Sequence, residues 1–202
     1  MQITKITTQA KRPDRYSIFV DGRYAFSLGE SALLEQKLVP GQELDSEQLV
    51  AYKQLSVSDK AYGRALRYAA LRPHSTWELE TYLKRRGVEE SVLKNILNKL
   101  SKLDFVDDVA FARIWVENRR LLKPVSRRRL QLELRQKHVS EDIIQKTLAS
   151  DEVTDRQTLK DLVQKKRQQT KYRNDNLKLM QYLSRQGFNY DDIRSVTQQP
   201  DD

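Results

Sequence analysis

The feature that most constrains this chain is an internal repeat of about 50 residues. The stretch Ser75-Thr-Trp-Glu-Leu79 matches Ser126-Arg-Arg-Arg-Leu130 at an offset of 51, and the next leucines, Leu83 and Leu134, also coincide. A third, weaker copy begins at Leu179, offset by 49 from the second. Repeats of this length are typical of helical units that bury their apolar faces against their neighbours. The sequence therefore predicts a repeat array.

Each copy has the periodicity of three helices separated by short turns. Ser75 followed by Glu78 is a capping box, and Gly87 and Gly187 stand where glycines end helices. The expected helices lie near 59–71, 75–86, 89–102, 107–122, 126–137, 140–149, 155–172, 175–186 and 189–197.

Residues 1–28 are typical of strands. Asp21-Gly22 separates the apolar runs Tyr16–Val20 and Tyr24–Leu28, and this dipeptide favours a type I′ hairpin turn. We expect a small antiparallel sheet, then a short helix over 31–36 and a second helix that Asp45 caps and that runs to about Leu55.

The predicted fold is therefore mainly α: three tandem three-helix repeats in a curved, elongated array, preceded by a small N-terminal β-rich module with short helices. An elongated array builds no single large core, in agreement with an apolar content of only 38%. The expected domains are the N-terminal module and the three repeats, at residues 1–57, 58–104, 105–150 and 151–202.

The chain is basic, and its excess charge is concentrated. It carries 37 Lys and Arg against 28 Asp and Glu, a net charge of +9, of which +7 lies within residues 113–137. Such a cluster favours a polyanionic partner, either nucleic acid or an acidic protein surface. The candidate partner- or DNA-binding residues are Arg113, Arg119, Arg120, Lys123, Arg127, Arg128, Arg129, Arg135 and Lys137.

Helical phase predicts how these residues are presented. Leu130 and Leu134 share the core face of their helix, whereas Arg128 and Arg135 lie on the opposite side. In the preceding helix, Arg113 and Arg120 are expected together on one face.

The two tryptophans are candidate stacking platforms for bases. Trp115 lies in an apolar stripe, which favours the core. Trp77 is compatible with packing between repeats or with contact to a partner.

Several kinds of chemistry lack the residues they need. The chain has no cysteine and two histidines, His74 and His138, and no glycine-rich phosphate-binding motif. Asp107 and Asp108 are adjacent, point about 100° apart on a helix, and are expected to cap it. We expect no catalytic residue, metal or cofactor, no membrane span and a cytoplasmic protein.

The residues around the basic cluster resemble the RecX family, regulators of the RecA recombinase. The resemblance is carried by Leu103-Asp-Phe-Val-Asp107-Asp108-Val-Ala-Phe111-Ala112-Arg113 and by the leucines and basic residues of 127–137. The first repeat, with Ala65-Leu66-Arg67-Tyr68 and Gly87, is similar to that family too. Two departures are His138, where the family usually has Gly, and Lys123-Pro124-Val125 in place of a small turn containing Gly.

The resemblance implies a protein that lodges in the groove of the RecA–DNA filament. We expect the protein to be a monomer. It implies inhibition or destabilisation of the filament, so that recombinase, ATPase and co-protease activity are suppressed, as in DNA repair and the SOS response. It also implies weak, nonspecific binding of single- or double-stranded DNA. The family's basic surface corresponds here to Arg113, Arg119, Arg120, Arg127, Arg128 and Arg135, without assigning any of them to protein or to DNA.

Two alternatives remain open. Each three-helix unit resembles a helix-turn-helix module in outline, so the chain could be a stand-alone DNA-binding protein. A metal-dependent nuclease that uses Asp107 and Asp108 is the less favoured alternative.

Overall fold

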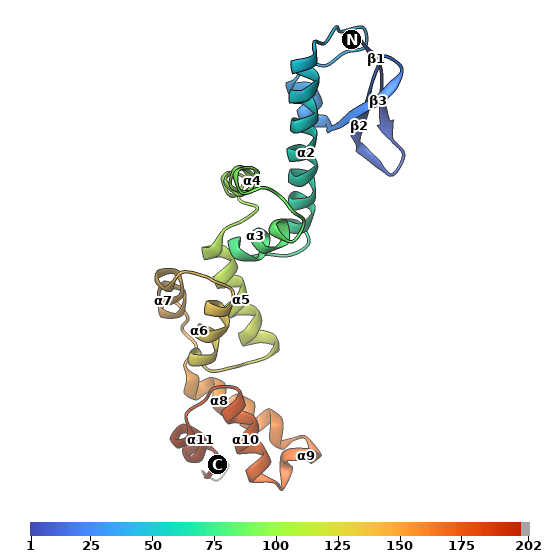
Figure 1. The fold of residues 1–202 in the computed structure, drawn as a ribbon. Helices are drawn as coiled ribbons and strands as arrows, with labels where there is room; N and C mark the ends of the chain where they lie inside the picture. The colour runs from blue at the N-terminus through green and yellow to red at the C-terminus, as the bar shows by residue number, and fades with distance from the viewer. Residues whose placement is uncertain (199–202) are drawn as a thin grey trace. The chain divides into compact units, whose positions relative to one another are not determined.

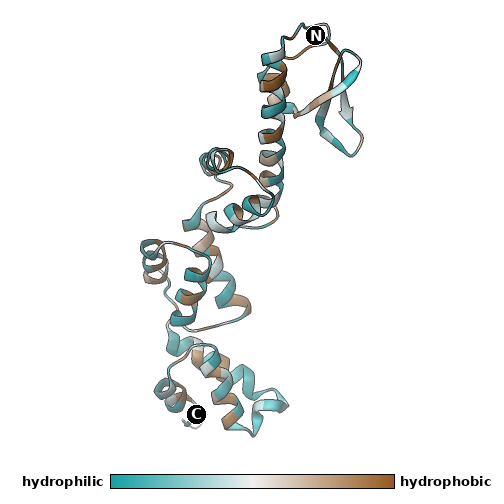
Figure 2. Ribbon diagram, viewed as in Figure 1, coloured by the Kyte–Doolittle hydropathy of each residue, from teal (hydrophilic) through white to brown (hydrophobic). Residues whose placement is uncertain are grey.

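A computed structural model describes residues 1–198, which fall into two compact units. Unit 1 contains residues 1–72 and 79–105, and unit 2 contains residues 73–78 and the chain from 106 onward. Most of the chain is helical, and strands occur at the N-terminal end of unit 1 (Figure 1). In Figure 2 the apolar residues appear as short brown stretches within the helices and not as one long run.

Unit 1 begins with a three-stranded antiparallel sheet in the order β1-β2-β3. The strands are β1 (Ile3–Gln9), β2 (Arg12–Val20) and β3 (Arg23–Gly29). Asp21 and Gly22, between β2 and β3, have φ angles of 47° and 77°. The type I′ turn requires this left-handed conformation at both positions, so the predicted hairpin is confirmed.

A short helix, α1 (Glu30–Glu35), follows the sheet, and the next helix differs from the expectation. Asp45 caps α2 in a capping box with Gln48, as predicted for the cap, but α2 (Ser46–Ala69) runs unbroken for 24 residues. The sequence pattern predicts a helix end near Leu55 and a new helix at 59. The expected boundary at 57/58 thus falls inside a helix, and the four-part domain division stays a prediction.

Contacts with the sheet explain why α2 does not break. The Ser56 hydroxyl donates to the carbonyl of Ser27 at 2.6 Å, and Asp59, one turn later, accepts from Arg15 and from the Gly29 N–H at 2.8 Å each. Because both turns are hydrogen-bonded to the sheet, the helix continues through the predicted boundary at 57/58.

Unit 1 also holds most of the first repeat. It contains the greater part of α3 (Thr76–Lys84), whose first turn belongs to unit 2, and all of α4 (Glu90–Lys102). Gly87 lies between these two helices and has a φ of 69°. This left-handed conformation is the one in which a glycine commonly ends a helix, as predicted.

The second and third repeats lie in unit 2, each around its own core. The second repeat has α5 (Asp108–Leu122), α6 (Arg127–Gln136) and α7 (Glu141–Ala149). Leu130 and Leu134 are fully buried in its core, together with Phe111, as their helical phase predicted.

The third repeat begins with a shorter helix than expected. The predicted helix over 155–172 is α8 (Asp155–Arg167) followed by α9 (Thr170–Arg173). The repeat ends with α10 (Asn176–Arg185) and α11 (Tyr190–Gln198), close to their expected bounds. Among residues 1–198, no helix is both long and apolar enough to cross a membrane.

Candidate interaction surface

The nine basic residues singled out by the sequence all lie in unit 2, on α5, on α6 or at the ends of these helices. The structure divides them into residues whose charged groups are engaged inside the protein and residues that face solvent.

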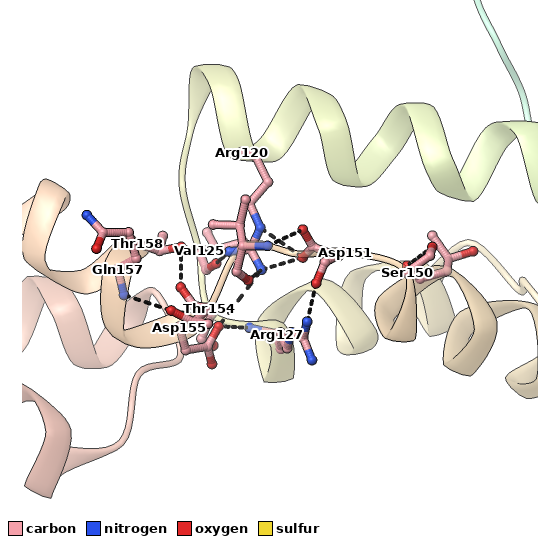
Figure 3. A network of polar contacts seen from close by, with 12 residues as sticks. Arg120, Val125, Arg127, Ser150, Asp151, Thr154, Asp155, Gln157 and Thr158 are labelled. Atoms are coloured by element: carbon pink, nitrogen blue, oxygen red, sulfur yellow. Dashed lines mark hydrogen bonds and ion pairs between the residues drawn. The ribbon is translucent and has the colours of Figure 1, made fainter.

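Arg120 belongs to the first group. Its guanidinium lies 2.6 Å from the Asp151 carboxylate, and it also donates to the carbonyl of Val125 and the hydroxyl of Thr158 (Figure 3). Only 10% of the Arg120 side chain is exposed. The segment that enters the third repeat covers Arg120, so Arg120 does not face solvent as Arg113 does.

Arg127 takes part in the same network. Its backbone N–H donates to Asp155 at 2.8 Å, and its guanidinium donates to the carbonyl of Asp151 (Figure 3). Its Nε is buried and has no hydrogen-bond partner within residues 1–198. Arg120 and Arg127 thus join the second repeat to the third.

Glu133 organises a second internal cluster. One carboxylate oxygen accepts from Arg119 at 2.8 Å and from the indole N–H of Trp115 at 3.0 Å, and the other lies 3.4 Å from Arg129. Glu133 is buried, and these donors satisfy its charge. Trp115 packs against the core of the second repeat, which confirms the core prediction.

The turn after α6 contacts the first turn of α3 within unit 2. Lys137 lies 2.6 Å from the Glu78 carboxylate, and the His138 ring stacks on Trp77 with centroids 4.3 Å apart. His138 has φ of 55°, the conformation that favours glycine. Of the two roles left open for Trp77, the structure shows packing, although 37% of the residue is exposed.

Asp107 caps α5 as predicted, whereas Asp108 accepts from the start of α3 and not from its own helix. Asp107 accepts from the Val109 N–H at 2.7 Å, and Asp108 accepts from the Thr76 N–H at 2.8 Å. His74 is buried. Within the described residues, no three Asp, Glu, His or Cys side chains are arranged to hold a metal ion.

The exposed group consists of Arg113, Lys123, Arg128 and Arg135. Arg135 pairs with Glu141 through two bonds of 2.9 Å. This pairing raises the pKa of Arg135. The pKa of Glu141 is lowered to about 2, chiefly by the hydrogen bonds from Arg135 and then by those from Gln145 and Gln131.

Exposed arginines from two repeats border one groove. A cavity of about 700 Å³ lies between α6 and α10. It is lined by Arg128, Arg129, Gln131, Leu132, Arg135, Ser184, Arg185, Gly187 and Phe188. Arg185 is not among the predicted residues, because it lies 50 positions beyond Arg135 and outside the charge cluster. No local signal brings Arg185 beside Arg128, because the groove joins helices of two different repeats.

Gly187 allows the two repeats to approach closely beside this groove. The backbone N–H of Ser126 donates to the carbonyl of Gln186 at 3.1 Å. A Cβ on Gly187 would lie 2.5 Å from the Ser126 hydroxyl and 2.9 Å from the Arg129 Cβ, which is closer than atoms pack. A side chain at this position is therefore excluded without a shift of the junction.

The fold and this surface define a class of protein: tandem three-helix repeats that follow an N-terminal sheet, with an arginine-lined groove between the second and third repeats. Four family models match the chain in order. They are described as the regulatory protein RecX N-terminal domain and the first, second and third three-helix domains of RecX, over residues 1–45, 61–109, 107–148 and 154–197. The chain belongs to the RecX family, which confirms the predicted family and fold class.

Curated relatives called Regulatory protein RecX support the same assignment. The one from Bacillus subtilis is 30% identical over 98% of this chain and 76% of its own length, and the one from Halalkalibacterium halodurans is 33% identical over 91% and 71%. The relative from Lactobacillus johnsonii is 37% identical over 72% of this chain. The chain spans about half of the length of that relative, 54%.

Two solved structures are similar to this chain. The crystal structure of regulatory protein RecX has a TM-score of 0.72 at 30% identity, over 98% of this chain and 99% of that one. The crystal structure of RecX from Lactobacillus salivarius has a TM-score of 0.57 at 26% identity, over 70% and 94%.

Proposed function

We propose that this chain is a negative regulator of the RecA recombinase. It binds in the groove of the RecA filament on DNA and inhibits or destabilises the filament, and so suppresses strand exchange, ATP hydrolysis and co-protease activity. It acts as a monomer in the cytoplasm, without catalysis or a cofactor of its own.

The observation that carries this proposal is the outward face of α6 within a chain of the RecX family. Arg128 and Arg135 are exposed there, on the side opposite the buried Leu130 and Leu134. A fixed cationic face on a packed helix suits a filament whose DNA is polyanionic, because complementary charge speeds association and sets the register of docking.

RecA-dependent ATP hydrolysis on single-stranded DNA tests the proposal. Stoichiometric amounts of this protein should lower the rate, and an unchanged rate would refute it. Co-sedimentation with RecA filaments, against a control that contains DNA alone, should show that binding depends on RecA.

Charge reversal tests whether the α6 face carries the inhibition. Arg128→Glu with Arg135→Glu should weaken inhibition and leave the helical circular dichroism signal intact. Lys146→Glu is the control, because Lys146 is an exposed lysine on α7 of the same repeat. Loss of the fold in the double variant would identify α6 as a packing face and contradict this assignment.

The alternative, a stand-alone DNA-binding protein, requires tight and sequence-dependent binding of free duplex. Weak binding that falls steeply with salt is instead the behaviour of a nonspecific phosphate interaction.

A further inference from the structure

The junctions on either side of the second repeat use the same construction. At each junction, the aspartate that begins the first helix of one repeat accepts a hydrogen bond from the repeat before it. The donor is the backbone N–H of the first residue in the second helix of that preceding repeat. Asp108 accepts from Thr76 and Asp155 from Arg127, both at 2.8 Å. In the repeat alignment, Thr76 corresponds to Arg127.

The two junctions differ in what fills the adjacent space. In the alignment, Trp77 corresponds to Arg128, and His138 corresponds to Gly187. Trp77 and His138 stack at 4.3 Å and close the first junction. Their counterparts, an arginine and a residue without a side chain, both line the 700 Å³ groove at the second. The groove is therefore open because the aromatic pair is replaced.

The lining of this groove is strongly cationic. It includes four arginines and no carboxylate. Arg129 and Arg135 are held by Glu133 and Glu141. Arg128 and Arg185 are exposed, and within residues 1–198 no hydrogen bond or ion pair engages their guanidinium groups. A concave surface lined by one sign of charge concentrates anions.

The chemistry of the lining selects phosphate oxygens over bases. Guanidinium groups bind phosphate through two parallel N–H donors, and the groove offers two of them unpaired, from facing helices. Its one aromatic residue, Phe188, is buried and presents no ring face on which a base could stack. The lining thus favours contact with a sugar-phosphate backbone and not with base edges.

The size of the groove favours a single strand. A volume of about 700 Å³ falls within the roughly 300–1,000 Å³ of small-ligand sites and accommodates a few nucleotides of one strand. We propose that the groove between α6 and α10 binds the phosphate backbone of single-stranded nucleic acid, independently of base sequence, through Arg128 and Arg185. This site deepens and rests on the proposed function, since it assigns the DNA component of the filament to this groove.

Fluorescence anisotropy with a labelled 20-residue oligothymidylate, and with a mixed-sequence strand of equal length, tests this site across a series of salt concentrations. The protein should bind both strands alike. Arg128→Ala with Arg185→Ala should lower the binding constant roughly tenfold or more at low salt and make the slope of log K against log salt less negative by about 1.4, or about 0.7 for each lost phosphate contact.

The matched control is Lys146→Ala with Lys178→Ala, which removes two exposed positive charges outside the groove. It should change the binding constant by less than about twofold, because nonspecific charge falls off with distance from the strand. Circular dichroism should show both double variants folded. If both double variants lose the same factor in the binding constant, binding depends on net charge and the proposed site is wrong. The proposed site is also wrong if the parent protein binds neither strand.

Competition distinguishes the proposed occupant from an acidic protein segment. Unlabelled oligothymidylate should displace the labelled strand far better than a 20-residue polyglutamate. Equal displacement by polyglutamate would overturn the assignment to nucleic acid.

The same variants separate this site from the regulatory function. If the parent protein inhibits RecA ATP hydrolysis but the groove variant binds strands as well as the parent does, the groove assignment is wrong and the regulator stands. If groove binding is found but RecA is unaffected, the site stands and the regulator is refuted.

Discussion

Arg120 and Asp151 form an ion pair with an N–O distance of 2.6 Å, in which only 10% and 7% of the two side chains are exposed. Arg120 lies in α5 of the second repeat, and Asp151 lies in the segment that enters the third. The charge cluster of the sequence therefore includes a residue whose charge serves the junction between repeats.

Removal of one member of this pair should destabilise unit 2. Asp151→Ala leaves the Arg120 guanidinium covered, with only the more distant Asp155 carboxylate at 3.9 Å. We expect the free energy of unfolding to fall by about 3 kcal/mol in chemical denaturation. Arg120→Met with Asp151→Leu removes both charges and should cost much less. A single variant as stable as the parent would contradict the buried-pair description.

Gly187 and Gly87 provide a matched pair of substitutions. Both have positive φ, 91° and 69°, but a Cβ on Gly87 would meet no atom within 4 Å. Gly87→Ala should cost about 1 kcal/mol of stability from backbone strain alone. Gly187→Ala should cost about 1–3 kcal/mol more, because its Cβ overlaps Ser126 and Arg129. If the two variants unfold at the same midpoint temperature, the junction between the second and third repeats accepts the added Cβ without loss of stability, which would contradict this prediction.

Leu134 and Leu132 test the phase of α6. Leu134 is fully buried, so Leu134→Ala should lower the free energy of unfolding by about 2–4 kcal/mol. Leu132 is 44% exposed, and Leu132→Ala should cost less than about 1 kcal/mol. Similar losses from the two substitutions would contradict the assigned core face.

Glu141 should titrate far below an ordinary carboxyl group. Its pKa is lowered to about 2 by hydrogen bonds from Arg135, Gln145 and Gln131. A depressed folded-state pKa means that the pairing contributes its stability above the unfolded-state pKa of about 4.3 and loses it as the pH falls toward 2. In a carboxyl-detected NMR titration, Arg135→Ala should move the Glu141 pKa upward, and an unchanged value would contradict the pairing.

The sequence predicted correctly those features that depend only on residues close together in the chain. The buried side of α6 follows from the spacing of Leu130 and Leu134, and the hairpin follows from Asp21-Gly22, because these signals are local. Arg120 is covered because it pairs with Asp151, which lies 31 positions away in the sequence. Helical phase does not indicate which distant segment will cover a given face of a helix. For the same reason the groove could be half predicted, through Arg128 and Arg135, but not through Arg185.

The unbroken α2 was missed for a related reason. The predicted boundary at 57/58 falls inside this helix, and only the sheet contacts of Ser56 and Asp59 show that the helix continues. Contacts between distant segments override local preference here.

The continuity of α2 makes the N-terminal sheet and the first repeat share one axis. Asp59 contacts the sheet, and Tyr62, three residues later, contacts Lys99 of α4, whose ammonium lies 4.5 Å from the ring centroid. A single residue inserted between these two anchors would rotate one set of contacts by about 100° and displace it by about 1.5 Å relative to the other. The N-terminal sheet therefore cannot be exchanged between related chains by itself. A chimera must take the sheet together with the whole of α2, with the length and register of this helix unchanged.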